Sequence, residues 1–531
     1  MANKSRSSPS STTPKLMETN GFSLMNEDLL RNILSRLPAT SFASAATVSK
    51  TWNAACCHIL SRPKLSSTIS LKPLPLVALQ EVFDKVMSEP IRPHFAIASV
   101  GPGFEIKDVL QFMVEKVGSR TPIIVSSVKG ILGRDALSHE FREVKWIDGN
   151  IDEVPVNTGI VLTVGFVPGL KVDVIPLLRQ RKAPQGSMID KFVLDIKSYT
   201  SSMSGCTSPQ AIIMIGDGSV DQKPILEKLD YAMSMETIIV GDERGQFVYS
   251  SSDVSRNVST NKKHSPDAVA LVFARDRNKA RGIGNIEFHF ALSKGVSAIG
   301  PRLKAASVRV QNSYTVTWLT ARREGQQEIL DGQQMLEDID NEMENNMDCV
   351  DLYIGVTRRR NCSVGSDKPR MMTTLALHGI EGGDSEYLYV DGAGIRTGDY
   401  FQFYHSDPKT ALSSSRNVSS TLRKLKLDWD SKSSLSKSTI INAVDKKEAF
   451  GGFIFSCLGR GESFFGELNV DSSPFLDNFP GVPVAGTFCA GEIGRGCTSL
   501  TANGDEGGSA RCHLHAYSTV YLVMSYTPPE H

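Results

Sequence analysis

The 531-residue sequence has no excess of charge of either sign, since 58 Lys and Arg residues balance 58 Asp and Glu residues. No long block of like charge occurs, so the electrostatic footprint of a nucleic-acid-binding protein is missing. No run of eighteen apolar residues occurs either, which excludes an ordinary membrane-spanning helix. We therefore expect neither nucleic acid nor a membrane among the partners.

A disulfide framework is also missing. The nine cysteines are an odd number without regular spacing, which is typical of thiols that stay reduced, and we expect a location in the cytoplasm and/or nucleus. One late group suggests a metal: Cys489, Cys497, Cys512, His513 and His515. Zinc sites usually include a close cysteine pair, and the spacing from Cys489 to Cys497 is too loose for one. We expect no metal and no other cofactor.

Catalytic motifs are equally scarce. No Ser-His-Asp or Cys-His order with a nucleophile elbow appears. Gly216-Asp217 lies between a predicted strand and a predicted helix, and without a lysine partner or an acidic ribose contact it is best interpreted as a simple turn. We therefore assign no catalytic residue and predict that the chain is not an enzyme.

The N-terminus opens on residues 1–20, which are rich in Ser, Thr, Pro and Lys and contain no apolar core of a signal peptide. We expect a disordered lead. An amphipathic helix is predicted next, because Leu29, Leu30, Ile33, Leu34 and Leu37 share one face. Asn26 is placed to cap this helix and Pro38 to end it.

This short helix cannot bury both flanks alone, so it must pack against the segment that contains Phe42, Val48 and Trp52. We expect a compact helical hairpin with spare apolar surface. The pattern of Leu24, Asp28-Leu29-Leu30, Ile33-Leu34, Leu37-Pro38, Val48-Ser49-Lys50 and Trp52 resembles an F-box. Met25 stands where most F-boxes have Pro, and Pro is favoured but not required early in a helix. The alternative is a hairpin that merely caps the next domain.

An F-box at residues 21–65 implies docking to a Skp-type adaptor and, through it, to cullin and RING subunits. The resemblance implies these adaptor-binding residues: Leu24, Leu29, Leu30, Ile33, Leu34, Leu37, Pro38, Val48 and Trp52.

Residues 66–93 are predicted to be a linker, with an edge strand as the alternative for its beginning, because Pro63, Pro73 and Pro75 interrupt this region. Leucines between 71 and 79 locally imitate a leucine-rich repeat. A real array needs further copies in register, and none follows.

From residue 94 the sequence predicts a layered α/β core over 94–325, because short apolar runs such as Phe95–Val100 and Ala211–Ile215 alternate with amphipathic helices. A charged, Gln-rich stretch of helical composition, 322–346, marks a change of character. Residues 326–526 are predicted to form a separate α+β unit with longer strands, and 416–446 a mobile loop followed by a helix. The fold class is thus mixed α+β and α/β behind a small helical module.

Both halves resemble the FIST domain. The most specific match is Gly452–Gly461 followed by Val482–Gly494, and the N-terminal half matches more loosely through 213–233 and 238–245. The order is that of an F-box-only protein with a FIST domain. In bacteria this family is thought to sense small ligands.

Candidate ligand- or substrate-binding residues lie in the best-matching part: Cys457, Arg460 and Glu492 stand next to glycines that allow close backbone approach. Arg460 would hold a carboxylate and Glu492 an amine, which suits an amino-acid-like ligand or a peptide terminus. The alternative is that the two side chains pair with each other.

The resemblance implies a substrate-recognition subunit of an SCF-type (Skp–cullin–F-box) ubiquitin ligase, whose FIST region selects an unknown protein for ubiquitination and degradation. A small-ligand sensor built on the FIST halves is the alternative.

Overall fold

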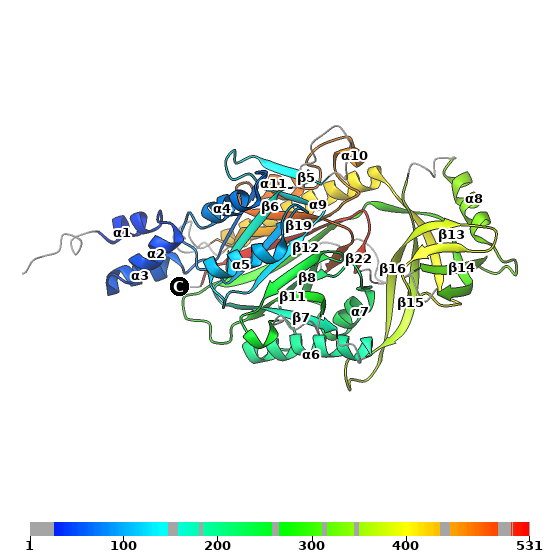
Figure 1. Ribbon diagram of the computed structural model, residues 1–531, viewed down its shortest axis with the longest axis horizontal. Helices are drawn as coiled ribbons and strands as arrows, with labels where there is room; N and C mark the ends of the chain where they lie inside the picture. Colours follow the sequence, from blue (N-terminus) through cyan, green and yellow to red (C-terminus); the bar gives the residue numbers. More distant parts are fainter. Residues whose placement is uncertain are drawn as a thin grey trace, which may run out of the picture.

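The computed structural model describes residues 26–146, 158–179, 184–257, 265–310, 316–344, 350–435, 446–496, 511 and 513–529. Figure 1 shows an elongated molecule with a small group of helices at one end, a layered α/β body in the middle and a strand barrel at the other end. No helix in these ranges is long and apolar enough to span a membrane.

The N-terminal module contains three short helices, α1 (Glu27–Leu34), α2 (Ala39–Ala45) and α3 (Lys50–Ile59). The Asn26 side chain accepts a hydrogen bond from the backbone of Asp28, so the predicted cap of α1 is confirmed. Ser49 caps α3 in the same way through the backbone N–H of Trp52. This second cap starts a new helix, which is why the module has three helices instead of a hairpin.

The prediction of a linker over 66–93 is wrong. Strand β1 (Lys64–Ser70) forms the edge of a sheet, as the alternative interpretation had it, and α4 (Pro75–Val86) follows with its apolar face buried. The prolines lie beside these elements or in the first turn of α4, where the missing N–H costs nothing. Their positions therefore mark boundaries of packed elements.

Three sheets form the body. The first has the strand order β1-β6-β2-β3-β10, and α4 and α5 (Ile106–Val117) pack on it. Its other strands are β2 (Phe95–Val100), β3 (Ile123–Ser127), β6 (Ile160–Phe166) and β10 (Gln246–Ser250). The short 3-10 helix η2 (Val254–Arg256) follows β10.

The second sheet has the order β22-β21-β9-β8-β11-β7, with α6 (Gln185–Ser204) packed on its β7 and β11 and α7 (Lys223–Ala232) packed against α6. Its strands are β7 (Leu170–Arg179), β8 (Ala211–Gly216), β9 (Ile238–Asp242), β11 (Ser265–Arg275), β21 (Glu492–Arg495) and β22 (Leu514–His515).

The third sheet has the order β12-β23-β19-β20-β4-β5. Its strands are β4 (Gly130–Arg134), β5 (Phe141–Lys145), β12 (Asn285–Ser293), β19 (Glu448–Cys457), β20 (Val484–Cys489) and β23 (Thr519–Thr527). The helices α9 (Pro408–Leu435), α10 (Glu462–Phe465) and α11 (Ser473–Asn478) accompany it. One hydrophobic core joins all three sheets through residues such as Phe95, Phe273 and Phe453.

The sequence had suggested that the two halves of the chain form separate units. The structure shows that they do not, because strands of the two halves pair with each other. Strand β12 of the first half pairs with β23 of the second, β4 pairs with β20, and β9 pairs with β21. Apolar runs identify strands but carry no information about which strands pair. The pairing between strands of the two halves could therefore not be predicted from the sequence pattern.

A closed barrel extends from this body, with the strand order β13-β14-β17-β16-β15-β18. Its strands are β13 (Val296–Val310), β14 (Val316–Arg323), β15 (Leu352–Cys362), β16 (Arg370–Gly383), β17 (Leu388–Asp391) and β18 (Tyr400–Ser406). Helix α8 (Gly332–Glu342) packs on the barrel and contributes Met335 and Ile339 to its apolar core. The predicted division at residue 325 therefore falls inside the barrel.

For 416–446 a mobile loop followed by a helix was predicted, and the loop is wrong for the first part of this range. Residues Pro408–Leu435 form α9, whose Val418, Leu422, Leu425 and Trp429 are buried against the third sheet and α11. These residues recur every three or four positions, so they define a helical face among the many serines and lysines.

Candidate functional site

The predicted adaptor-binding residues of α1 differ in solvent exposure. Leu30 and Leu34 are buried, at 3% and 0% exposure, in a small core with Phe42 and Cys56. Leu29 and Ile33, four residues apart on the neighbouring face of α1, are 54% and 41% exposed. The core of the module is thus complete without Leu29 and Ile33, which leaves both free for a partner.

The remaining predicted residues divide in the same way. Leu37 and Trp52 are partly buried and pack against the core of the module, whereas Pro38 is exposed and Val48 is 63% exposed. Leu24 lies outside the described residues. The module therefore presents Leu29, Ile33, Pro38 and Val48 to solvent, and exposed apolar side chains grouped in so small a module are typical of an interaction surface.

The module is fixed to the body by specific contacts. The backbone N–H of Ala39 donates to the carbonyl of Met87 at 2.9 Å, and Ala39 packs into the core beneath α4. Arg62 forms an ion pair with Glu448 at 3.1 Å. A partner bound to the module would consequently have a defined orientation relative to the body.

A second candidate site is a pocket of about 250 Å³ between the body and the barrel. It lies where the parallel pairs β8/β9 and β19/β20 end, and its walls include Glu243, Cys457, Gly491 and Glu492. In α/β sheets ligands bind outside the carboxyl ends of the strands. Tyr353 closes the pocket from the barrel side.

Glu492 is the most unusual group in this pocket, because its side chain has no exposed surface. Oε2 accepts hydrogen bonds from the hydroxyl of Ser518 at 2.8 Å and from its backbone N–H at 3.3 Å. Oε1 accepts no hydrogen bond from an N–H or O–H group of the described residues, and the Cys457 thiol is a further hydrogen-bond partner of the carboxyl group. Burial raises the pKa of Glu492 to about 8, so the carboxyl group is largely protonated at neutral pH.

Other charges around the pocket are paired. Arg244 binds Asp391 at 2.7 Å and Glu243 at 3.4 Å, which links the body to the barrel. His515 Nε2 lies 3.0 Å from the carbonyl oxygen of Gly494, and burial lowers the pKa of this imidazole to about 4, so it is neutral. Burial also raises the pKa of the Cys457 thiol. Lys223 also lines the pocket and lies 3.8 Å from Asp221, so Glu492 and Lys223 are the groups in its wall with hydrogen-bonding capacity left for a ligand.

Arg460 does not line this pocket. It does not pair with Glu492 either, so the alternative that these two side chains bind each other is wrong. Its fully buried guanidinium binds Asp471 through Nε at 2.9 Å and a second nitrogen at 2.7 Å. It also donates to the Ser293 hydroxyl and to the carbonyl of Tyr517. These bonds direct the planar fork at Asp471, so in this structure Arg460 connects four segments and faces the buried Asp471 carboxylate and not the pocket.

The suspected metal ligands are not brought together either. His513 Nε2 lies 3.2 Å from Asp230, whereas His515 Nε2 points to Gly494 and Cys489 lies beside Thr487. Cys497 and Cys512 lie outside the described residues. Within the described ranges no three side chains of His, Cys, Asp or Glu are placed to hold a metal ion.

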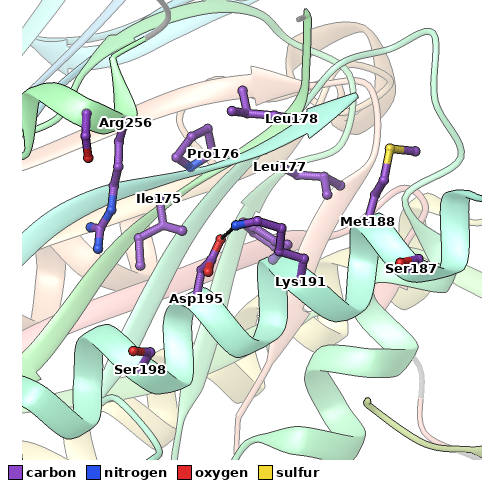
Figure 2. Close-up of a pocket in the computed structure, with 12 residues that line it drawn as sticks. Ile175, Pro176, Leu177, Leu178, Ser187, Met188, Lys191, Asp195, Ser198 and Arg256 are labelled. Carbon is purple, nitrogen blue, oxygen red and sulfur yellow. Dashed lines mark hydrogen bonds and ion pairs between the residues drawn. The ribbon is translucent and has the colours of Figure 1, made fainter. Parts of the chain in front are cut away.

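Another cavity, of about 370 Å³, lies beside the edge strand β7 and helix α6 (Figure 2). Lys191 and Asp195 of α6 form an ion pair there at 2.6 Å. The β7 edge is poorly suited to adding a strand, because Pro176 has no N–H and Val174 donates its own to the Asp173 carboxylate. We assign this cavity no function.

Sequence reasoning named Glu492 and Cys457 but missed Glu243, Arg244 and Tyr353. The first two directly follow β9, and a polar pair after a buried strand is a signal that the sequence offered. Tyr353 could not be found in this way, because the barrel brings it to the pocket.

Comparisons with known proteins agree with this architecture. The F-box domain matches residues 22–63, and the FIST C domain matches residues 379–495. An F-box/LRR-repeat protein of Arabidopsis thaliana is 45% identical over 509 residues, which cover 95% of this chain and 93% of that protein. An uncharacterized protein of Mycobacterium tuberculosis is 50% identical over 44 residues, which cover 8% of this chain and 12% of that protein.

These matches define the class: the chain has the general role of a substrate adaptor of SCF ubiquitin ligases, and its F-box supports binding of a Skp-type adaptor. More narrowly, the chain belongs to the F-box proteins that carry a FIST domain. The name of the Arabidopsis relative mentions leucine-rich repeats. In this chain the leucines between 71 and 79 lie in one turn and in α4, and the described strands build sheets and a barrel without a repeated unit.

Proposed function

We propose that the chain is the substrate-recognition subunit of an SCF-type ubiquitin ligase and is itself non-catalytic. Its N-terminal module docks the Skp adaptor, and the FIST region selects the protein to be ubiquitinated and degraded. The cytoplasm and/or nucleus is the proposed location. The observation that carries the proposal is the exposed apolar surface of a module whose own core is already complete.

The shape of the molecule supports this division of labour. The module and the barrel lie at opposite ends of the long axis (Figure 1), and Arg62, Ala39 and α4 fix the module to the body. A substrate held at the barrel end would thus be presented at a set distance from the adaptor, which is what transfer of ubiquitin by partner subunits requires.

The test is calorimetry of the purified full chain with a Skp-type adaptor. We expect saturable binding with a dissociation constant in the micromolar range or below. Absence of heat at micromolar concentrations, with a folded protein, would refute the ligase assignment whatever the barrel binds.

We propose a small-ligand sensor as the second candidate function, because buried Glu492 lines a pocket between body and barrel and its Oε1 accepts no hydrogen bond from an N–H or O–H group of the described residues. An unpaired buried polar atom costs about 1 to 3 kcal/mol, and a ligand that donates to it removes this cost. An amine is the group that Glu492 suits best. Because the carboxyl group must ionise to pair with an ammonium, binding would release a proton, which calorimetry in buffers of different ionisation enthalpy detects.

A further inference from the structure

A group of unpaired cations lies on the outer surface of the barrel, on strands β13 and β14. We define the basic barrel face as Arg302, Lys304, Arg309 and Arg322. Arg302, Lys304 and Arg309 are exposed, and Arg322 is partly so. No carboxylate within the described residues forms an ion pair with any of the four. In a chain whose formal net charge is zero, such a concentration of one sign is a local feature.

The strand register places like charges opposite each other on this face, which lowers the stability of the fold. Lys304 lies directly opposite Arg322 in the β13–β14 pair and directly opposite Tyr400 in the β13–β18 pair. Neighbouring residues Leu303, Ala305 and Ala321 point into the barrel core, so Lys304 and Arg322 share the outer surface. Like charges directly opposite in a sheet are destabilising. Among the described residues no carboxylate forms an ion pair with either of them, which indicates a use other than stability.

Aromatic rings support these cations. Arg302 lies 4.4 Å and Lys304 5.4 Å from the centre of the Tyr400 ring. Further along the same strands, Arg309 lies 5.1 Å from the ring centre of Tyr387, next to Trp318. Trp318 in turn meets Tyr389 edge to face at 5.4 Å. Trp, Tyr and Arg are the residue types that dominate the binding energy of protein interfaces.

Two of the carboxylates near this face, Asp338 and Asp384, are already engaged, whereas Glu324 beside β14 and Glu386 beside Tyr387 are exposed. Asp338 of α8 binds Arg323 at 2.6 Å. Asp384 accepts hydrogen bonds from the Tyr389 hydroxyl and from the backbone of Tyr387. None of these four carboxylates forms an ion pair with the four cations, so the guanidinium and ammonium groups of the basic barrel face are available to a partner.

The basic barrel face also has a suitable position. The pocket described above places Tyr353 of β15 and Leu377 of β16 against the body. Strands β13 and β14 lie on the side of the barrel away from the body, at the end of the molecule opposite the N-terminal module (Figure 1). A partner bound there would not collide with an adaptor bound to the module.

We propose that the basic barrel face is the substrate-docking surface and that it binds an acidic segment of a protein substrate, rich in Asp and Glu with an occasional apolar side chain. Arginine forks pair with carboxylates in a bidentate manner, and the Trp318 cluster supplies apolar contact. Nucleic acid fits less well, because guanidinium groups or neighbouring rings occupy the faces on which bases would stack. This inference rests on the proposed role as a substrate receptor.

The test uses the full chain in complex with the Skp adaptor to select from a library of random short peptides. We expect the wild-type protein to enrich peptides with an excess of Asp and Glu. The variant Lys304→Glu/Arg309→Glu should bind the enriched peptides at least tenfold more weakly. Raising the salt concentration from about 0.05 M to about 0.5 M should weaken wild-type binding as well, because exposed charges are screened.

A matched control is Lys107→Glu/Arg120→Glu, which makes the same change in net charge at exposed positions on and just after α5. It should bind the peptides like the wild type. No enrichment, enriched peptides without acidic excess, or equal binding by the barrel variant would overturn the inference. So would a single-stranded oligonucleotide that displaces the peptides at equal charge concentration. Adaptor calorimetry on the same proteins tests the ligase role separately, since neither variant touches the module.

Discussion

Replacing Leu29 and Ile33 together by Ala should weaken adaptor binding without unfolding the protein. Full burial of such a side chain is worth about 1.5 to 3 kcal/mol. Because Leu29 is 54% and Ile33 is 41% exposed in the free protein, the adaptor can bury at most these fractions. Scaling by exposure gives about 0.8 to 1.6 kcal/mol for Leu29 and about 0.6 to 1.2 kcal/mol for Ile33. The sum corresponds to a loss of affinity of about tenfold to a hundredfold.

The assay is a calorimetric titration of the adaptor into the full chain, combined with a thermal melt. The matched control is Leu194→Ala/Leu427→Ala, which removes helix side chains of similar exposure, 44% and 57%, at positions far from the module in the sequence. The control should bind like the wild type. Equal affinity of the Leu29→Ala/Ile33→Ala variant and the wild type would refute the assignment of this face, and a large fall in its melting temperature would refute the claim that the two side chains lie outside the core.

Three further results are expected. Leu34→Ala, at a fully buried position, should destabilise the N-terminal module by about 2 to 5 kcal/mol, seen as faster hydrogen exchange over residues 26–60. Arg460→Ala leaves Asp471 buried without its cation and should lower the free energy of unfolding by about 3 to 5 kcal/mol in denaturant titrations. The double variant Arg460→Met/Asp471→Asn should recover part of this loss. An unchanged unfolding midpoint of Arg460→Ala would contradict a structural role. The pKa of Glu492 in the folded protein is about 8, above its value in the unfolded chain, so the free energy of unfolding should be highest at low pH and fall as the pH rises from about 4.5 to 8. The slope is at most about 1.4 kcal/mol per pH unit. Glu492→Gln should reduce this slope in thermal melts across the same pH range.

The pocket at Glu492 shows where sequence reasoning reached its limit. The glycines around Cys457 and Glu492 directed attention to the correct strand ends, since β19 ends at Cys457 and β21 begins at Glu492. The same reasoning assigned Arg460 to the pocket because it is close in sequence. In the fold the partner of Arg460 is Asp471, eleven residues away. Whether Arg460 meets Asp471 or Glu492 depends on how the chain turns after β19.

The boundaries failed for a related reason. Proline-rich residues 66–93 were expected to link two units, yet Leu65 and Ile69 of β1 enter the main core and α4 covers the first sheet. Composition describes a segment, whereas burial depends on the surface that a distant segment presents to it. The charged stretch after β14 contains α8, as its helical composition predicted, but this helix packs on the barrel and does not divide two units.

The sequence by itself determined the first helix of the N-terminal module and the existence of most buried strands. Both depend on interactions within a few residues: the Asn26 cap, the spacing of the α1 leucines and the apolar runs. Only the tertiary structure decided which leucines of α1 are buried and which are exposed, because α2 and α3 cover one side of that helix. It also decided that β12 pairs with β23, where Ile286 lies opposite Tyr526, since the free energy of such contacts comes from segments far apart along the chain.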